Sequence, residues 1–114
     1  MRMRLTKPAN RTARPGEPGS GMRPHAARAA ALLKALGNEQ RLMVLCHLAA
    51  GPLAVGELNA RLRLSQSALS QHLGILRDSG IVATRRASQS IIYSLPAGVV
   101  TRIIALLHRQ FCAP

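Results

Sequence analysis

Hydrophobic residues recur along much of the chain with the period of an α-helix. Within residues 65–76, Leu69, Leu73 and Leu76 fall on one face of a predicted helix. The opposite face carries uncharged side chains that form hydrogen bonds, namely Gln66, Ser67, Ser70 and Gln71. Such a face usually carries Glu and Lys in solvent, whereas Gln and Ser can meet base edges without bringing unpaired charge into an interface. This helix is therefore expected to lie in the major groove of DNA.

Turn and capping residues divide the rest of the sequence into short elements. Pro24 and Gly37 bound a first helix, and Asn38 and Ser65 are suited to cap two later helices. The predicted helices span residues 24–36, 39–50, 55–62 and 66–77, the strands span 81–85 and 90–95, and a last helix runs from Pro96 nearly to the chain end. The order α-α-α-α-β-β-α predicts a mainly helical protein with a small β-hairpin, as in a winged helix-turn-helix fold.

Two of the predicted helices have apolar faces that also need partners. In the second helix this face consists of Leu42, Leu45, Cys46 and Ala49. In the last helix it consists of Val99, Val100, Ile103, Ile104, Leu107 and Phe111. A single domain of about 90 residues has little surplus stability, so we expect the protein to be an oligomer.

Residues 1–23 differ in composition from the rest. They are basic, contain several Pro and Gly residues and have scarcely any apolar ones, so we expect a disordered tail before a single domain at 24–114. The tail lacks the apolar stretch of a secretory signal, and the sequence has no apolar run long enough to cross a bilayer. These features predict a cytoplasmic protein that does not bind membranes.

The charge balance favours a polyanionic partner. There are 16 Lys and Arg residues against 4 Asp and Glu, which gives a formal net charge of +12. The excess is not confined to the tail, and a basic folded domain favours contact with DNA phosphates. With one Phe, one Tyr and no Trp, stacking on single-stranded nucleic acid is not expected.

Three segments resemble a known family of regulators. These are Leu-Leu-Lys-Ala-Leu-Gly-Asn-Glu-Gln-Arg-Leu at 32–42, Leu-Ser-Gln-Ser-Ala-Leu-Ser-Gln-His-Leu at 64–73 and Ile-Ile-Tyr-Ser-Leu at 91–95. They resemble the ArsR family of winged-helix repressors, and within it the redox- and persulfide-sensing group that includes HlyU, BigR and SqrR. The resemblance implies a homodimer joined by its first and last helices. Its two recognition helices would enter successive major grooves of double-stranded operator DNA.

The resemblance also implies which residues contact DNA. On the recognition helix these are Ser65, Gln66, Ser67, Ser70, Gln71 and His72, and on the wing they are Arg85, Arg86 and Gln89. Two alternatives remain open. His72 is equally well explained as a partly buried helix residue, and Arg85 and Arg86 as solvated charges on a hairpin, although the basic composition favours phosphate contact.

The familiar metal sites of this family lack their ligands here. One class uses Cys-x-Cys in the third helix, where this chain has Val-Gly-Glu-Leu-Asn-Ala-Arg-Leu. The other uses paired Asp, His and Glu residues on the last helix, where His108 stands alone. We therefore expect neither of these metal sites and no cofactor.

The inducer site is expected at Cys46 and Cys112. In the redox-responsive relatives, these two positions form a dithiol pair, so the resemblance implies that persulfide, polysulfide or another oxidant links them by a disulfide or polysulfide bridge and releases the DNA. The other interpretation of Cys46 is a small core residue.

Other functions remain as alternatives to the thiol switch. A soft-metal sensor would use Cys46, His108 and Cys112, and an inducer-free anti-repressor would need no sensing site. A thiol enzyme is not expected, because neither cysteine has an obvious orienting acid nearby in the sequence.

Overall fold

The computed structural model describes residues 21–112. These residues fall into two compact units, the first ending at Lys34 and the second starting at Ala35. Residues 1–20, which hold most of the predicted disordered tail, lie outside the described range. A short 3-10 turn at Arg23–His25 leads into helix α1 (Ala26–Leu36). The last two residues of α1, Ala35 and Leu36, belong to the second unit and are buried.

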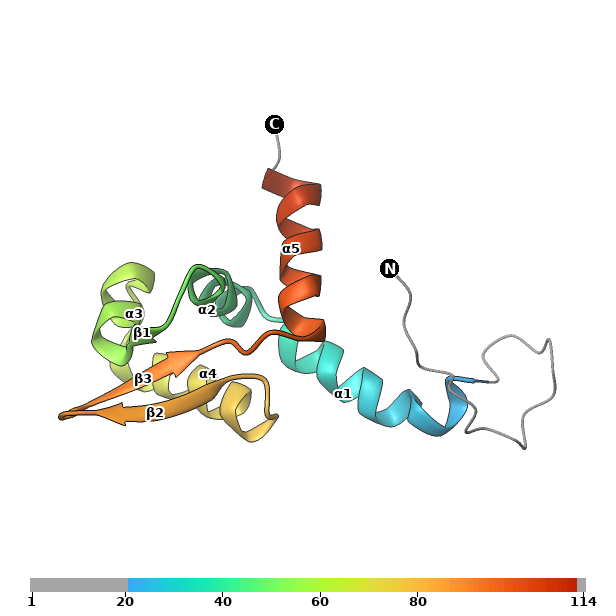
Figure 1. Cartoon of the computed structure of the whole chain (residues 1–114), viewed down its shortest axis with the longest axis horizontal. Helices are drawn as coiled ribbons and strands as arrows, with labels where there is room; N and C mark the ends of the chain where they lie inside the picture. The colour runs from blue at the N-terminus through green and yellow to red at the C-terminus, as the bar shows by residue number, and fades with distance from the viewer. Residues whose placement is uncertain (1–20, 113–114) are drawn as a thin grey trace. The chain divides into compact units, whose positions relative to one another are not determined.

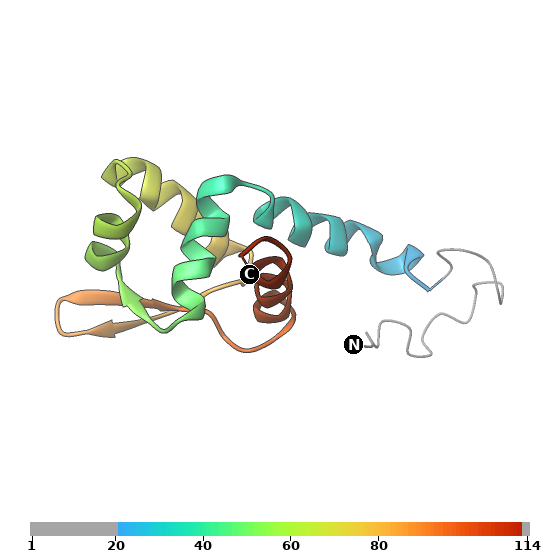
Figure 2. The same cartoon turned by 90° about the horizontal axis from the view of Figure 1, so that it is seen from above.

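Helix α2 (Glu39–Ala49) is the central element of the second unit and contacts α3, α4, α5 and β3 (Figures 1 and 2). Asn38 caps it as predicted, since its side chain accepts hydrogen bonds from the backbone N–H groups of Gln40 at 2.9 Å and Arg41 at 3.0 Å. The buried residues of α2 are Val44, Leu45 and Leu48.

The predicted inward face of α2 is only partly correct. Leu45 is buried, but Leu42 is half-buried, and Cys46 and Ala49 are exposed. The helix carries apolar residues on more than one side, and its neighbours cover the side of Val44 and Leu48. The periodicity therefore identified the helix, while packing against the other elements selected its buried face.

Helices α3 (Val55–Leu62) and α4 (Gln66–Asp78) form the helix-turn-helix, with bounds close to those predicted. Ser65 caps α4, accepting a hydrogen bond from the N–H of Ala68 at 3.1 Å. The predicted leucine stripe of α4 is confirmed, because Leu69, Leu73 and Leu76 are all buried. Each such side chain contributes roughly 1.5–3 kcal/mol by burial, which holds the opposite face of α4 outward.

The wing is part of a three-stranded antiparallel sheet with the order β1-β3-β2. Strands β2 (Ala83–Ala87) and β3 (Ser90–Ser94) form the predicted hairpin, but β2 starts and ends two residues later than expected. Ile81 and Val82, which were predicted to begin it, are buried outside the strand. Strand β1 (Leu53–Ala54), which pairs with Tyr93 and Ile92 of β3, was not predicted, because two residues carry no readable alternation.

Helix α5 (Val99–Cys112) begins later than the predicted start at Pro96. Gly98 and Thr101 set its start, because the Gly98 N–H donates to Thr101 Oγ1 at 2.8 Å, and that hydroxyl donates to the Gly98 carbonyl at 2.7 Å. Val100 and Ile104 are buried, whereas the C-terminal half of α5 projects beyond α2 (Figure 1). None of the helices in residues 21–112 is long and apolar enough to span a membrane.

Candidate DNA interface and thiol site

The outward face of α4 is polar and uncharged along the first two turns of the helix. The side chains of Gln66, Ser67, Ser70 and Gln71 are exposed, as is the capping residue Ser65. The charged residues of the helix, Arg77 and Asp78, come only in its last turn. This face therefore offers uncharged hydrogen-bond donors and acceptors, which can pair with base edges in the major groove.

The turn before α4 is held by Asn59 from α3. Its side-chain Nδ2 donates to the carbonyl of Leu64 at 2.7 Å, and its own carbonyl accepts from the N–H of Arg63 at 2.9 Å. Arg63 adopts the left-handed conformation with φ 57°, which ends α3 and turns the chain into α4. These contacts fix the conformation of the connection between α3 and α4, and so the direction in which α4 starts at Ser65.

His72 lies at the border between the buried and outward faces of α4. It is half-buried, and its Nδ1 atom is 3.4 Å from Nη1 of Arg41 in α2. The partly buried position expected as one alternative is thus observed. Because the contact with Arg41 involves only Nδ1, the Nε2 atom of His72 is not used by that contact.

The wing carries exposed polar residues at its tip. Arg85, Arg86 and Gln89 are exposed, and the two-residue turn at Ser88 and Gln89 has Ser88 in the left-handed region with φ 59°. Arg85 pairs with Ile92 and Arg86 with Ile91, so the two arginines point to opposite faces of the sheet.

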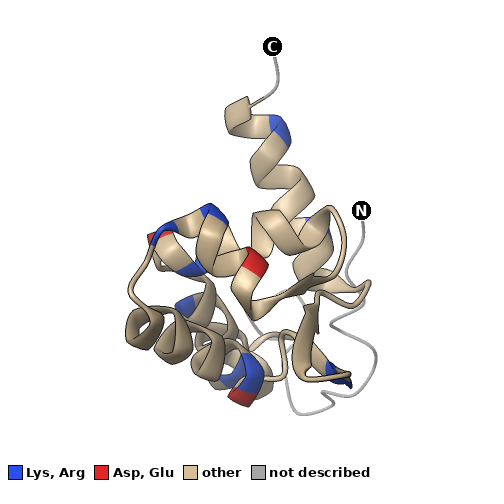
Figure 3. Cartoon of the chain, turned by 90° about the vertical axis from the view of Figure 1, so that its left-hand side faces the viewer, with Lys and Arg blue, Asp and Glu red and all other residues tan. Residues whose placement is uncertain are grey.

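Three arginines near this surface were not singled out from the sequence. Arg61 and Arg63 are exposed beside the turn into α4, and Arg77 is exposed at the end of α4. Their position next to the N-cap and C-terminus of α4 is the signal that would have identified them. In residues 21–112 there are 11 Lys and Arg but only three acidic residues, and Figure 3 shows this imbalance along the ribbon.

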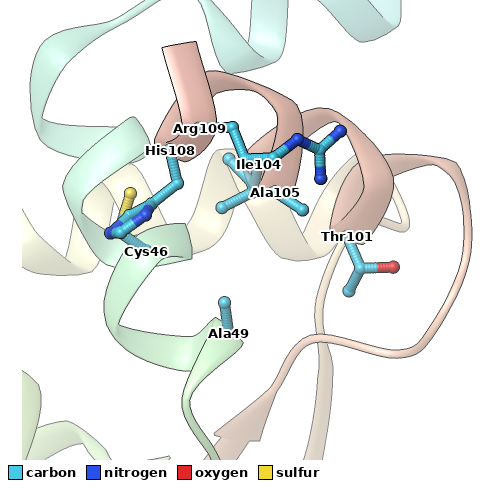
Figure 4. Close-up of a pocket in the computed structure, with 7 residues that line it drawn as sticks. All are labelled: Cys46, Ala49, Thr101, Ile104, Ala105, His108 and Arg109. Atoms are coloured by element: carbon cyan, nitrogen blue, oxygen red, sulfur yellow. The ribbon is translucent and has the colours of Figure 1, made fainter. Parts of the chain in front are cut away.

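A second candidate site is an open pocket of about 420 Å³ between α2 and α5. Its lining residues are Cys46, Ala49, Thr101, Ile104, Ala105, His108 and Arg109 (Figure 4). Figure 4 shows the Cys46 thiol and the His108 ring at the same end of the pocket. A nucleophilic sulfur, an imidazole and a guanidinium therefore share one solvent-open surface.

Both cysteines are exposed and free. Cys46 is thus not the small core residue that one alternative expected. The structure does not place the two sulfurs in bonding contact, and Cys112 is the last residue of α5, one helical turn beyond His108. Partial burial raises the pKa of Cys46 above its ordinary 9.0, and the negative charge of a Cys112 thiolate raises it further. Cys46 is therefore mostly protonated at neutral pH.

The alternative metal site receives no support from the arrangement of side chains. Cys46 and His108 share the pocket, but within residues 21–112 no three His, Cys, Asp or Glu residues gather closely enough to hold a metal ion. The described part of the chain therefore contains a recognition helix whose first two turns present an uncharged polar face, a wing with two exposed arginines, and a pocket that holds a thiol. These features define the class of winged helix-turn-helix DNA-binding proteins.

Comparison with known proteins agrees with this class. Residues 38–84 match the family model described as "Bacterial regulatory protein, arsR family". The chain is 52% identical over 91 residues to the transcriptional activator HlyU of Vibrio cholerae, covering 80% of this chain and 84% of that protein. It is 46% identical over 97 residues to the biofilm growth-associated repressor of Agrobacterium fabrum, covering 85% of this chain and 83% of that protein.

Solved structures show the same fold. Reduced HlyU from Vibrio cholerae matches with a TM-score of 0.76 at 52% identity, over 80% of this chain and 96% of that one. A homodimeric winged helix-turn-helix DNA-binding domain from Mycobacterium bovis matches with a TM-score of 0.69 at 28% identity, over 78% of this chain and 82% of that one. The chain belongs to the ArsR family of bacterial regulatory proteins. It is a DNA-binding transcriptional regulator.

Proposed function

We propose that this regulator is a homodimeric repressor that binds operator DNA through α4 and the wing. A sulfur bridge between Cys46 and Cys112 then releases the DNA. The observation that carries the proposal is the exposed, uncharged face of α4, which three buried leucines hold outward next to exposed arginines.

The DNA contacts divide into two kinds. Ser67, Ser70 and Gln71 lie on the outward face of α4 and are assigned to base edges, with Gln66 beside them. Arg85, Arg86 and Gln89 of the wing are assigned to the backbone or the adjacent minor groove, together with Ser65 at the start of α4. A regulator with this division should lose affinity steeply as salt rises, because each phosphate contact releases counterions.

The apolar end of α5 supports a dimer. Leu106 and Phe111 are 57% and 79% exposed, which is unusual for large apolar side chains on one short helix segment. Phe111 lies four and seven positions after Leu107 and Ile104, so a second copy that packed on this face of α5 would cover it. The related domain from Mycobacterium bovis, which is homodimeric, supports this assignment.

The thiol chemistry follows from the different positions of the two cysteines. Cys112 is exposed at the end of α5, whereas the raised pKa of Cys46 makes it the poorer attacking thiol. We assign the first step to the Cys112 thiolate, which attacks the outer sulfur of a persulfide, RSSH, and expels RS⁻. The Cys46 thiolate then attacks the Cys112 sulfur of the resulting persulfide and expels HS⁻, leaving a disulfide. The persulfide supplies both oxidising equivalents, so no other oxidant is needed.

The bridge would change the position of α5 relative to α2. Both thiols are free in the present structure, so closure of the bridge must bring the Cys112 sulfur at the end of α5 into bonding distance of the Cys46 sulfur on α2. Helix α2 contacts both α5 and α4, so a bridge that constrains α2 and α5 acts on an element that packs against the recognition helix. A coupling of about 1–3 kcal/mol would lower operator affinity by roughly 5-fold to 150-fold.

One experiment tests the proposal as a whole. The reduced full-length protein would first select a duplex from a random DNA library, and binding of that labelled duplex would be followed by fluorescence anisotropy. The same samples would be treated with glutathione persulfide and analysed by intact mass under non-reducing conditions. The expected result is release of DNA together with loss of two hydrogens, the mass change that formation of the disulfide produces.

Single variants provide the controls. Cys46→Ser and Cys112→Ser should bind the duplex as wild type does when reduced, and neither should release it after treatment. Release by either variant would disprove the paired-thiol mechanism. If the bridged protein still binds DNA, the sulfur bridge does not control DNA binding. If the reduced protein selects no duplex, the proposal that it binds operator DNA is refuted.

A further inference from the structure

Arg41, in the first turn of α2, makes contacts with two other segments of the second unit. Its Nε donates to the carbonyl of Ala35 at 2.6 Å, and its Nη1 lies 3.4 Å from Nδ1 of His72 in α4. Its backbone N–H donates to the side chain of Asn38 at 3.0 Å. All three contacts are partly buried. One residue thus links the chain before α2 to the middle of the recognition helix.

The contact with Ala35 fixes the guanidinium. Ala35 lies in the last turn of α1, where carbonyl groups lack partners within the helix and cations are favoured. At 2.6 Å this is a close hydrogen bond from a charged donor, and such bonds are stronger than those between neutral groups. Because the Asn38 cap holds the backbone and Ala35 holds Nε, the Nη1 group has a defined position when it meets His72.

This contact determines the tautomer of His72. A guanidinium donates hydrogen bonds and cannot accept them, so Nδ1 of His72 must be the acceptor. In the neutral ring the proton then sits on Nε2. Arg41 therefore holds His72 as an Nε2–H donor.

The Nε2 atom of His72 is not fully buried. Among residues 21–112, the ring of His72 forms its hydrogen bond to Arg41 through Nδ1. If Nε2 were fully buried it would lack a partner, but no buried side-chain nitrogen or oxygen in these residues lacks one. The atom therefore has access to solvent. His72 also follows Gln71 at the border of the outward face of α4, which places its free donor beside the proposed base-contacting residues rather than at their centre.

We propose that Arg41 is a positioning residue for DNA binding, because it orients His72 so that Nε2–H donates to a phosphate oxygen of the DNA backbone. This inference rests on the proposed DNA-binding face of α4. A phosphate suits the place of His72 at the edge of that face, where a donor meets the backbone rather than a base edge. The contact would add affinity equally for all sequences.

Two substitutions of His72 separate its two nitrogens. Asn places an oxygen near the position of Nδ1, so His72→Asn keeps the acceptor for Arg41 and loses the outer donor. Gln places an amide near the position of Nε2, so His72→Gln keeps an outer donor and loses the contact with Arg41. We expect His72→Asn to weaken binding of the selected duplex and of unrelated duplexes alike, by about fivefold to tenfold. His72→Gln should weaken it by about twofold to threefold.

The role of Arg41 is tested by combining substitutions. Arg41→Lys keeps the charge but cannot hold both partners, and it should weaken DNA binding by about threefold in the wild type and not further in His72→Gln. Long-range ¹⁵N–¹H spectra of the reduced protein without DNA should show the Nε2–H tautomer of His72. The Arg41→Lys variant should show a mixture of tautomers. Melting temperatures of all variants would confirm that each remains folded.

Specific outcomes overturn the inference. A wild-type His72 protonated on Nδ1, equal losses from Arg41→Lys in both backgrounds, or unchanged binding by His72→Asn would each refute it. The Gln71→Ala variant distinguishes failure of the Arg41–His72 inference from failure of the proposal that the outward face of α4 binds DNA. If Gln71→Ala weakens binding and His72→Asn does not, this inference alone is wrong, whereas no effect from either refutes the face itself.

Discussion

Nη1 of Arg77, in the last turn of α4, donates a hydrogen bond to the phenol oxygen of Tyr93 in β3 at 3.5 Å. The Tyr93 ring is only 5% exposed and packs in the core, so its hydroxyl connects the wing to the recognition helix from a fixed position. The distance is at the upper limit for a hydrogen bond, which makes the contact weak. Its value lies in setting the position of the wing relative to α4 rather than in stability.

Substitution of Tyr93 should separate these two effects. Tyr93→Phe keeps the buried ring and removes the hydroxyl, so the free energy of unfolding should fall by less than about 1 kcal/mol. Binding of the selected duplex should weaken by about twofold to fivefold, because the wing is less firmly placed. Tyr93→Ala is the contrast and should cost about 3–5 kcal/mol in urea unfolding. Unchanged DNA affinity in Tyr93→Phe would show that the bond does not position the wing.

The two wing arginines should not contribute equally. Arg86 lies on the same face of the sheet as Tyr93, which contacts α4, whereas Arg85 points to the other face. We expect Arg86→Ala to reduce the slope of log affinity against log salt by about one, as loss of one phosphate contact does. Arg85→Ala is the matched control and should change the slope less. Equal slopes for the two variants would contradict this assignment of faces.

The cap of α2 should be important for stability. Asn38→Ala leaves the backbone N–H groups of Gln40 and Arg41 without their acceptor, so the free energy of unfolding should fall by about 0.5–2 kcal/mol. Asn38→Asp retains an acceptor and adds a favourable charge at the helix start, so its stability should stay near that of the wild type. Urea denaturation measures both. A loss of the same size in Asn38→Asp would mean that the hydrogen bonds are not the cause.

The raised pKa of Cys46 predicts a pH-dependent reactivity. Partial burial is the larger cause and the Cys112 charge the smaller, so Cys112→Ser should lower the pKa of Cys46 while leaving it above 9.0. Near pH 9.0, more Cys46 would then be thiolate, and its alkylation by iodoacetamide should be faster in Cys112→Ser than in the wild type.

Peptide mass spectrometry resolves the two cysteines in that experiment. The protein unfolded in urea serves as the control. In that state the pKa of Cys46 should be that of an ordinary thiol, so its alkylation rate should be the same in the wild type and in Cys112→Ser. A slower reaction of Cys46 in folded Cys112→Ser would show that Cys112 does not act on it through charge.

Much of the candidate interface could be predicted from local pattern. The buried stripe of Leu69, Leu73 and Leu76 was visible because α4 has one apolar side, and its polar side could only face outward. Ser65 and Asn38 were recognisable as caps because short polar side chains at those positions bond the first free N–H groups.

Elements with ambiguous or very short patterns were predicted less well. On α2 the apolar residues occur on several sides, so the prediction that Cys46 and Ala49 lie on the inward face was wrong. The two-residue strand β1 is defined by its pairing with β3 and has no signal of its own. Helix α5 begins at Val99 rather than at the predicted Pro96, because Gly98 and Thr101 form two hydrogen bonds with each other at the start of the helix.

The sequence by itself determined the helical periods, the caps, the basic character and the polar face of α4, because these depend on neighbouring residues. Only the tertiary structure decided that Arg41 contacts His72, that Tyr93 contacts Arg77 and that Cys46 shares a pocket with His108. Each of these pairs joins residues at least 16 positions apart in the chain. Local pattern cannot specify such contacts, since they depend on how whole elements pack against one another.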